Sequence, residues 1–143
     1  FALVVDVNTH DILARLEGHS AKVTSAAFRR DQQNIVVTIS EDRRFLLFDI
    51  SAGAVLYQSS IISLSAFSCL DVVQHHDCSW CAIGSSDGRV RVYDIGIPSC
   101  PLLHTIDVNS LTGLRQRPWM KPPAAASSSS EADRSPQGVK VIS

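Results

Sequence analysis

Short apolar runs alternate with polar turns along the first 108 residues of the chain. Most of these runs are rich in β-branched and aromatic residues, and each has the length of a β-strand rather than a helix. The turns between them are too short for the crossovers that parallel strands need. The pattern therefore predicts an all-β fold of antiparallel, locally connected strands. The predicted strands span residues 1–6, 12–16, 23–28, 35–39, 45–49, 55–57, 67–73, 80–83, 90–94 and 102–108.

The ends of three predicted strands recur at a regular spacing. Phe48-Asp49 and Tyr93-Asp94 each close an apolar strand, an Asp-containing turn and a second apolar strand, and Val5-Asp6 is a degenerate third copy. The spacing is 43 residues from Asp6 to Asp49 and 45 residues from Asp49 to Asp94. This is the period of a four-stranded propeller blade. We therefore predict two blades and half of a third, with Phe48 and Tyr93 at equivalent places in successive sheets.

Charge and cysteine content exclude several classes of partner. The formal net charge is −1 and the charges are interspersed, so we expect no nucleic acid and no membrane partner. No apolar run approaches the ~20 residues of a membrane-spanning helix. The chain has four cysteines, Cys69, Cys78, Cys81 and Cys100, but no other sign of secretion. Reduced thiols and an intracellular location are therefore expected.

Two segments resemble WD repeats. The first combines Gly18-His19, the strand at 23–28, the run 35–40, Glu41-Asp42 and the closing run 45–49, and the second is the run 81–94. The resemblance covers about residues 1–108 and implies a partial β-propeller of four-stranded antiparallel blades. We expect the remaining propeller blades to come from a longer parent chain, of which this is a C-terminal piece. Alone, with fewer blades than a ring needs, the chain should be marginally stable or prone to association.

In WD repeats a His, a strand Ser or Thr, a turn Asp and the closing Trp form a buried hydrogen-bonded tetrad. The resemblance implies part of this tetrad in the first unit, where His19, Asp42 and a hydroxyl from Thr38 or Ser40 match. Phe48 replaces the Trp, and its ring has no N–H to donate. The first network is therefore expected to be incomplete.

The second unit departs further from the tetrad. Ser85 and Asp87 match, Tyr93 offers an O–H from a different position, and no Gly-His occurs between Gln58 and Ala66. We therefore expect this network also to be incomplete, and both blades to rely on apolar packing. Independently of the family, turn carboxylates such as Asp87 accept the backbone N–H groups of their own turns, so we interpret them as structural rather than catalytic.

The resemblance also implies recognition of a protein or peptide partner on the narrow face of the propeller. Strand-entry loops and turns contribute to that face in the family. The matching partner-binding positions are Ser20, Lys22, Glu41, Arg43, Ser86 and Arg89.

The segment from His75 to Cys81 offers an alternative chemistry. Cys78 and Cys81 form a C-x-x-C pair next to His75 and His76, which mimics half of a zinc site. The remaining ligands would be distant, and Cys81 lies on a predicted strand, so we favour a polar hairpin loop followed by a core strand. The sequence contains no Gly-rich phosphate cradle and no G-x-S-x-G elbow. We therefore expect no catalytic residue, no metal and no cofactor.

Residues 110–143 form a Pro- and Ser-rich tail, which we predict to be disordered, most clearly over 112–138. Ser128, Ser130 and Ser135 are possible phosphorylation sites, and 139–142 is either a short strand or a loose terminus. The predicted organisation is thus an incomplete WD-repeat propeller over 1–109 followed by this tail. The favoured function is a non-enzymatic scaffold for protein–protein interaction. The alternatives are a metal-binding module built on the His75–Cys81 cluster and a fragment without independent activity.

Overall fold

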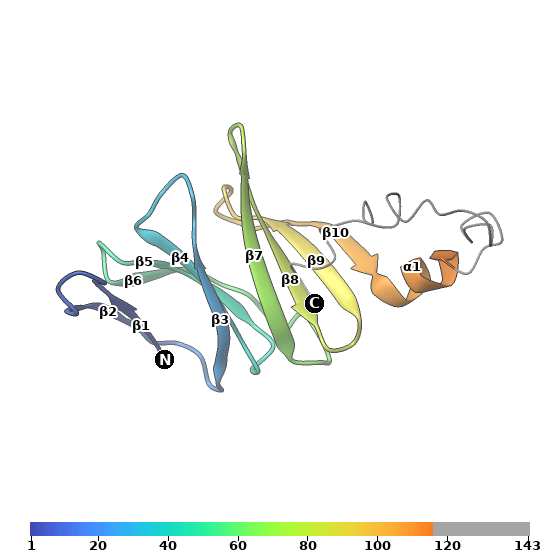
Figure 1. Ribbon diagram of the computed structural model, residues 1–143, viewed down its shortest axis with the longest axis horizontal. Helices are drawn as coiled ribbons and strands as arrows, with labels where there is room; N and C mark the ends of the chain where they lie inside the picture. The colour runs from blue at the N-terminus through green and yellow to red at the C-terminus, as the bar shows by residue number, and fades with distance from the viewer. Residues whose placement is uncertain (116–143) are drawn as a thin grey trace, which may run out of the picture.

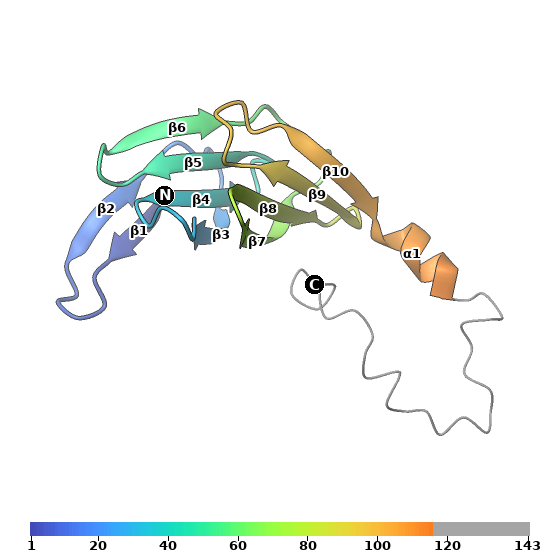
Figure 2. The same cartoon turned by 90° about the horizontal axis from the view of Figure 1, so that it is seen from above.

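Three antiparallel sheets stand side by side in the computed structural model, which describes residues 1–115 and the side chains up to residue 111 (Figures 1 and 2). The first sheet, here called the half blade, pairs β1 (Ala2–Val5) with β2 (Ile12–Leu16). Blade 1 contains, in spatial order, β3 (Val23–Phe28), β4 (Ile35–Ser40), β5 (Phe45–Asp49) and β6 (Ala54–Gln58). Blade 2 contains β7 (Phe67–His75), β8 (Cys78–Ser85), β9 (Arg89–Asp94) and β10 (Leu102–Asp107). The predicted all-β fold of two four-stranded blades and half of a third is confirmed.

The two blades share one register. Thr38 pairs with Leu46 in blade 1, and Ile83 pairs with Arg91 in blade 2, so an offset of 45 residues superimposes β4–β5 on β8–β9. The closing aspartates also make the same hydrogen bond in each unit. Each carboxylate accepts the backbone N–H two residues later, at 2.8 Å for Asp6, 2.9 Å for Asp49 and 2.9 Å for Asp94. The repeat read from the sequence is therefore a repeat of hydrogen-bonded turns that connect the third and fourth strands.

The core lies between the sheets because alternate residues of each strand point to opposite faces. Phe45 and Leu47 of β5 face blade 2 and belong to the larger apolar cluster, which blade 2 completes with residues such as Phe67, Val72 and Ile83. The intervening Leu46 and Phe48 face the half blade, where they form a smaller cluster with Leu16 and Val36. Blade 1 is thus buried on both faces.

Phe48 and Tyr93 occupy equivalent positions, as the repeat requires. Each lies on the third strand of its blade and faces the preceding sheet. Phe48 packs in the cluster that contains Leu16 of β2, and the Tyr93 ring lies 4.8 Å from that of Phe45 in β5.

The first hairpin of blade 2 is longer than predicted. β7 and β8 pair as far as His75 and Cys78, leaving only His76-Asp77 as the turn, with His76 at φ 50°. The hairpin projects beyond the rest of the sheets (Figure 1). The expected polar loop is therefore mostly strand, because local pairing of the two polar flanks satisfies their backbone groups.

The expectation of strand through residue 108 and of no helix is wrong at one place. Helix α1 spans Val108–Arg115, so the predicted tail begins as helix over residues 110–115. Asp107 caps the helix, since its carboxylate accepts the Asn109 N–H at 2.9 Å and its carbonyl accepts the Ser110 hydroxyl at 2.7 Å. The rest of the predicted tail, including its candidate phosphorylation serines and the 139–142 strand, lies outside the described residues. No helix in the described part of the chain is long and apolar enough to cross a lipid bilayer.

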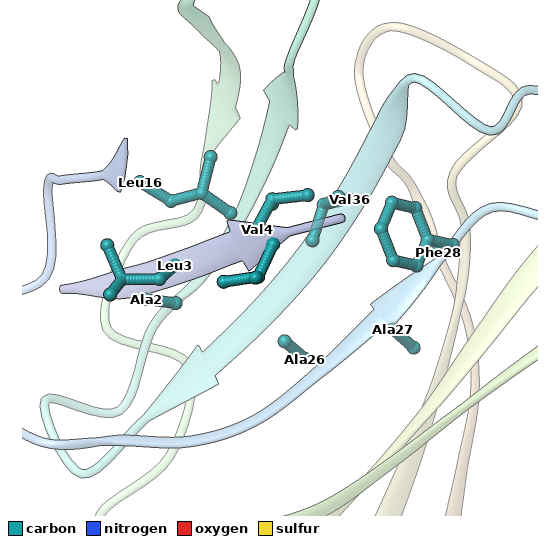
Figure 3. A pocket seen from close by; sticks show the side chains of 9 residues that line it. Ala2, Leu3, Val4, Leu16, Ala26, Ala27, Phe28 and Val36 are labelled. Carbon is teal, nitrogen blue, oxygen red and sulfur yellow. The ribbon is translucent and has the colours of Figure 1, made fainter. Parts of the chain in front are cut away.

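An apolar groove of about 320 Å³ lies beside β1 (Figure 3). β1 pairs only with β2 among the described residues, and its closing Asp6 makes it the equivalent of the third strands β5 and β9. The groove therefore occupies the place that the first and second strands fill in blades 1 and 2. It is lined by Ala2, Leu3, Val4, Val5, Leu16, Ala26, Ala27, Phe28 and Val36. That a longer parent chain supplies these strands stays a prediction.

Candidate functional site

Four loops of the two blades meet at one end of the sheets, which we call the loop end. They are residues 18–22, 41–44, 59–66 and 86–89. Backbone hydrogen bonds join them in turn. The Glu41 N–H donates to the Lys22 carbonyl at 2.9 Å, the Ile62 N–H to the Arg43 carbonyl at 3.3 Å, and the Ser86 N–H to the Ala66 carbonyl at 3.1 Å. The loops of both blades thus form one continuous surface.

A buried network fixes the first two loops to each other. The His19 side chain is 1% exposed, with Nδ1 2.8 Å from Asp42 Oδ2 and Nε2 2.8 Å from Thr38 Oγ1. Asp42 also accepts the backbone N–H groups of Ser20 at 3.0 Å and Arg44 at 3.0 Å, as expected for a turn carboxylate. Because a carboxylate only accepts, Nδ1–H is the donor to Asp42, and the Thr38 hydroxyl is the second partner of the ring.

The remaining two predicted members of this network have other roles. Ser40 does not bond the imidazole, because its Oγ accepts the Asp42 N–H at 3.1 Å. Phe48 is 4% exposed and packs against Leu46 in the smaller apolar cluster. Gly18 lies close above these side chains, with φ 140°, and a Cβ there would sit 2.8 Å from Leu46 Cδ2. Packing against the Gly-His segment therefore replaces the hydrogen bond that a Trp would donate.

Blade 2 carries a different network, centred on a buried arginine. Arg91 is 7% exposed, and its Nη1 donates to Ser85 Oγ at 2.9 Å. The Ser85 hydroxyl donates to Asp87 Oδ1, and Arg91 Nη2 lies 3.6 Å from Asp87 Oδ2. Ser63 reaches across from the loop at 59–66 and donates to Asp87 Oδ2 at 3.3 Å. Arg91 and Ser63 thus supply the partners that the absent Gly-His would have provided, and the network is less incomplete than expected.

Sequence reasoning missed Arg91 and Ser63. The 45-residue offset places Ile83 where blade 1 has Thr38, so the strand hydroxyl of the tetrad is absent from blade 2 and Ser85 corresponds to Ser40. Arg91 belongs to no motif that singles it out in the sequence. The alternation of side chains along the strand could have revealed its burial, because Arg91 lies two positions before Tyr93 and therefore on the same buried face.

Tyr93 does not join the network, which corrects the expectation for this residue. Its hydroxyl is buried and has no hydrogen-bond partner among the described residues. Burial raises the pKa of Tyr93 to about 12. The ring instead packs on Phe45, because the third-strand aromatic points at the preceding blade rather than at the turn.

The comparison with known families agrees with this geometry. Residues 10–49 and 59–94 match the family described as WD domain, G-beta repeat (WD40). The chain belongs to the WD-repeat family. The first match runs from β2 through β5 and the second from β7 through β9, so each WD repeat ends at a closing aspartate, Asp49 or Asp94. WD repeats generally mediate protein–protein interaction, and the family is typically non-enzymatic.

The structure places all six predicted partner-binding residues of the WD repeats at the loop end. Five of them are exposed and Arg43 is half-buried. Arg43 has φ 67°, an unusual conformation for a residue with a side chain. The five exposed residues are Ser20, Lys22, Glu41, Ser86 and Arg89.

The alternative site at His75–Cys81 lies at the opposite end of blade 2. Cys81 is fully buried in the core between the blades, and burial raises the pKa of its thiol to about 12. Cys78 is exposed at the hairpin tip, on the other face of β8. Within residues 1–111 no group of three or more His, Cys, Asp or Glu side chains is placed to hold a metal ion. The C-x-x-C pair therefore does not converge on one point.

The two network carboxylates differ in what sets their acidity. Burial alone would raise the pKa of Asp42, but hydrogen bonds from His19 and from the Ser20 N–H outweigh it and hold the pKa below its ordinary value. For Asp87 the hydrogen bond from Ser85 is the largest cause of a lowered pKa, with smaller help from the Arg89 N–H and the Arg91 charge. Both carboxylates are therefore ionised in the folded protein at neutral pH.

Acid should destabilise the fold through these groups. A carboxylate with a lowered pKa contributes stability above its unfolded pKa, and that stability is lost as pH falls through the folded pKa, here below about pH 4. We expect the unfolding free energy, measured by urea titration between about pH 7 and pH 3, to fall less steeply in Asp42→Asn than in the wild type. Asp77→Asn, in the exposed hairpin turn, is the matched control. If the unfolding free energies of Asp42→Asn and Asp77→Asn fell equally steeply with decreasing pH, Asp42 would not be a source of the acid sensitivity.

Proposed function

We propose that this chain is a non-enzymatic WD-repeat scaffold that binds a protein or peptide partner through the loop end. The observation that supports it is the fixed shape of this surface, where hydrogen bonds join loops from both blades and leave outward side chains uncovered. A surface ordered before binding loses less entropy when a partner docks. Leu64 is 95% exposed there, which is unusual for a large apolar side chain on an anchored loop.

The absence of enzymatic activity is part of the proposal. Asp42 and Asp87, the carboxylates of the two networks, are each bound by several donors within the fold. Such carboxylates hold loops in place and are poorly suited to moving protons. An intracellular location is proposed with it, since it rests on the reduced state expected of the cysteines.

Charge reversal at the loop end should weaken binding of the partner. We expect the double variant Lys22→Glu, Arg43→Glu to weaken partner binding by at least about tenfold, equivalent to about 1.4 kcal/mol, because the reversed charges repel a surface complementary to the native one. The measurement is cross-linking from a photoreactive amino acid at position 64 of the full chain, followed by quantitative mass spectrometry of the cross-linked protein.

The control makes the same kind of charge reversal once, at another position. Arg30→Glu lies in the turn between β3 and β4, at the opposite end of blade 1, and should leave the cross-linked partner unchanged. If the double variant and Arg30→Glu cross-linked equal amounts of the partner, the loop end would not be the binding surface.

A further inference from the structure

Cations gather at the loop end without acidic partners. Lys22 lies in the first loop, Arg43 and Arg44 in the second, and Arg89 in the last. Among the described residues, none of these four side chains has a carboxylate within 4 Å; the pairs formed at that distance involve other cations. Since the loops are hydrogen-bonded neighbours, the four charges belong to one surface.

The acidic residues of the same loops are already engaged. Asp42 is bound by His19, and Asp87 is bound by Ser85 and lies 3.6 Å from the buried Arg91. Glu41 is the one exposed acid in these loops. Asp107 borders the same surface, since it pairs with Arg89 in the β9–β10 ladder, but its carboxylate accepts the Asn109 N–H. Cations therefore outnumber uncommitted acids at the loop end, although the whole chain has a net charge of −1.

The backbone at Arg43 is a second, independent observation. Arg43 adopts φ 67°, and the equivalent turn position in blade 2 is Gly88, with φ 78°. Glycine adopts this conformation without steric cost, whereas a side chain makes it unfavourable. Strain of this kind is often retained where the side chain is used. Blade 1 thus keeps a cation at a turn position where glycine would fit better.

An apolar feature lies between the cations. The loop at 59–66 is anchored by two buried serines: Ser59 Oγ accepts the Phe45 N–H at 3.0 Å, and Ser63 bonds Asp87. Between and beside these anchors, Ile61 is 51% exposed and Leu64 is 95% exposed. The anchored loop therefore presents apolar side chains in a fixed position rather than on a loose segment.

We propose that the loop end binds an acidic peptide segment of a partner protein, with its carboxylates on Lys22, Arg43, Arg44 and Arg89 and an apolar side chain against Leu64. This rests on the proposed function and names the chemistry of the partner. Arginine recognises carboxylates through paired hydrogen bonds, and burial of Leu64 supplies affinity that charge pairs at an exposed surface do not. A nucleic acid fits less well, because the large exposed aromatic side chains on which bases would stack, Phe1, Phe28 and Trp80, lie outside these loops.

The test uses the full chain and two fluorescein-labelled peptides. One carries Asp and Glu on both sides of two leucines, and the other replaces every acid by Asn or Gln. We expect the acidic peptide to bind at least about tenfold more tightly in fluorescence anisotropy, and the difference to shrink as salt is raised. Equal binding of the two peptides would overturn the proposal, as would stronger binding of a single-stranded RNA oligonucleotide of equal length.

Arg43→Gly separates binding from folding. It removes one cation and also the strained side chain, so the melting temperature should hold or rise while affinity for the acidic peptide falls several-fold. Leu64→Ser should weaken both peptides alike. The matched controls are Arg30→Glu and Val7→Ser, in turns at the opposite end of the sheets, and neither should change binding. Unchanged affinity in Arg43→Gly would contradict the proposal.

Failure of this inference can be told from failure of the proposed function. Selection from a random peptide library on the full chain should enrich acidic sequences that Arg43→Gly and Arg89→Glu no longer retain. Enrichment of uncharged peptides that cross-link to position 64 would leave the scaffold function standing and overturn the acidic partner. If no peptide is enriched and position 64 cross-links to nothing, both fail.

Discussion

Replacement of Arg91 by methionine is expected to lower the unfolding free energy by about 3 kcal/mol. The change keeps most of the apolar length of the side chain but removes the guanidinium that donates to Ser85 and faces Asp87. Arg91 is buried and the Asp87 side chain is only 23% exposed, so loss of the guanidinium leaves Asp87 without its cation and the Ser85 hydroxyl without its donor, and both losses lower stability. The affected network also holds the loop at 59–66 through Ser63, so the loss should extend to the shape of the loop end.

Urea unfolding of the full chain measures this effect. Arg89→Met is the matched control, because it makes the same substitution at the exposed first residue of β9 and should change stability by no more than about 0.5 kcal/mol. Addition of Asp87→Asn to Arg91→Met should cost less than the sum of the two single changes, since the carboxylate is no longer charged. Similar losses in Arg91→Met and Arg89→Met would show that the network contributes little.

Truncation of Phe45 to alanine should cost about 3–5 kcal/mol and is expected to be the most damaging single change in the core. Phe45 is fully buried where the blades meet, with its ring 5.4 Å from that of Tyr57 and 4.8 Å from that of Tyr93. The cavity would open between two sheets, which cannot close on it without moving as units. For a small domain this loss is a large part of the total stability.

Phe28→Ala is the control for this prediction. Phe28 lies on β3 of the same blade but is 49% exposed, so its truncation removes little buried surface. We expect a change within about 1 kcal/mol, measured by the same urea titration. Equal destabilisation by the two truncations would mean that the interface between the blades is not the main source of stability.

The fold was predictable because its signals are local. Each strand carries its apolar run, and each closing aspartate sits two residues before the N–H that it binds, so the repeat can be read from positions 6, 49 and 94 alone. Helix α1 has no comparable signal. It is eight residues long, and its start depends on the cap at Asp107, which in the sequence looks like the polar end of a strand.

The candidate site was only partly predictable. The loop positions of Lys22, Arg43 and Arg89 follow from the resemblance to WD repeats, as does the contact of His19 with Asp42. Arg91 and Ser63 do not follow from it, because their roles depend on contacts across blade 2 and on the family's usual histidine being absent. A charged residue in a strand is normally solvated, so burial of Arg91 became visible only from its neighbours in space.

The unequal sizes of the two apolar clusters imply unequal cohesion along the molecule. The cluster between blades 1 and 2 contains side chains from both, whereas fewer buried side chains hold the half blade against blade 1. Local opening is easiest where few apolar contacts must be broken. Of the three sheets, the half blade is therefore the first to detach transiently, and the surface that carries Arg43 and Leu64 keeps its form while it does so.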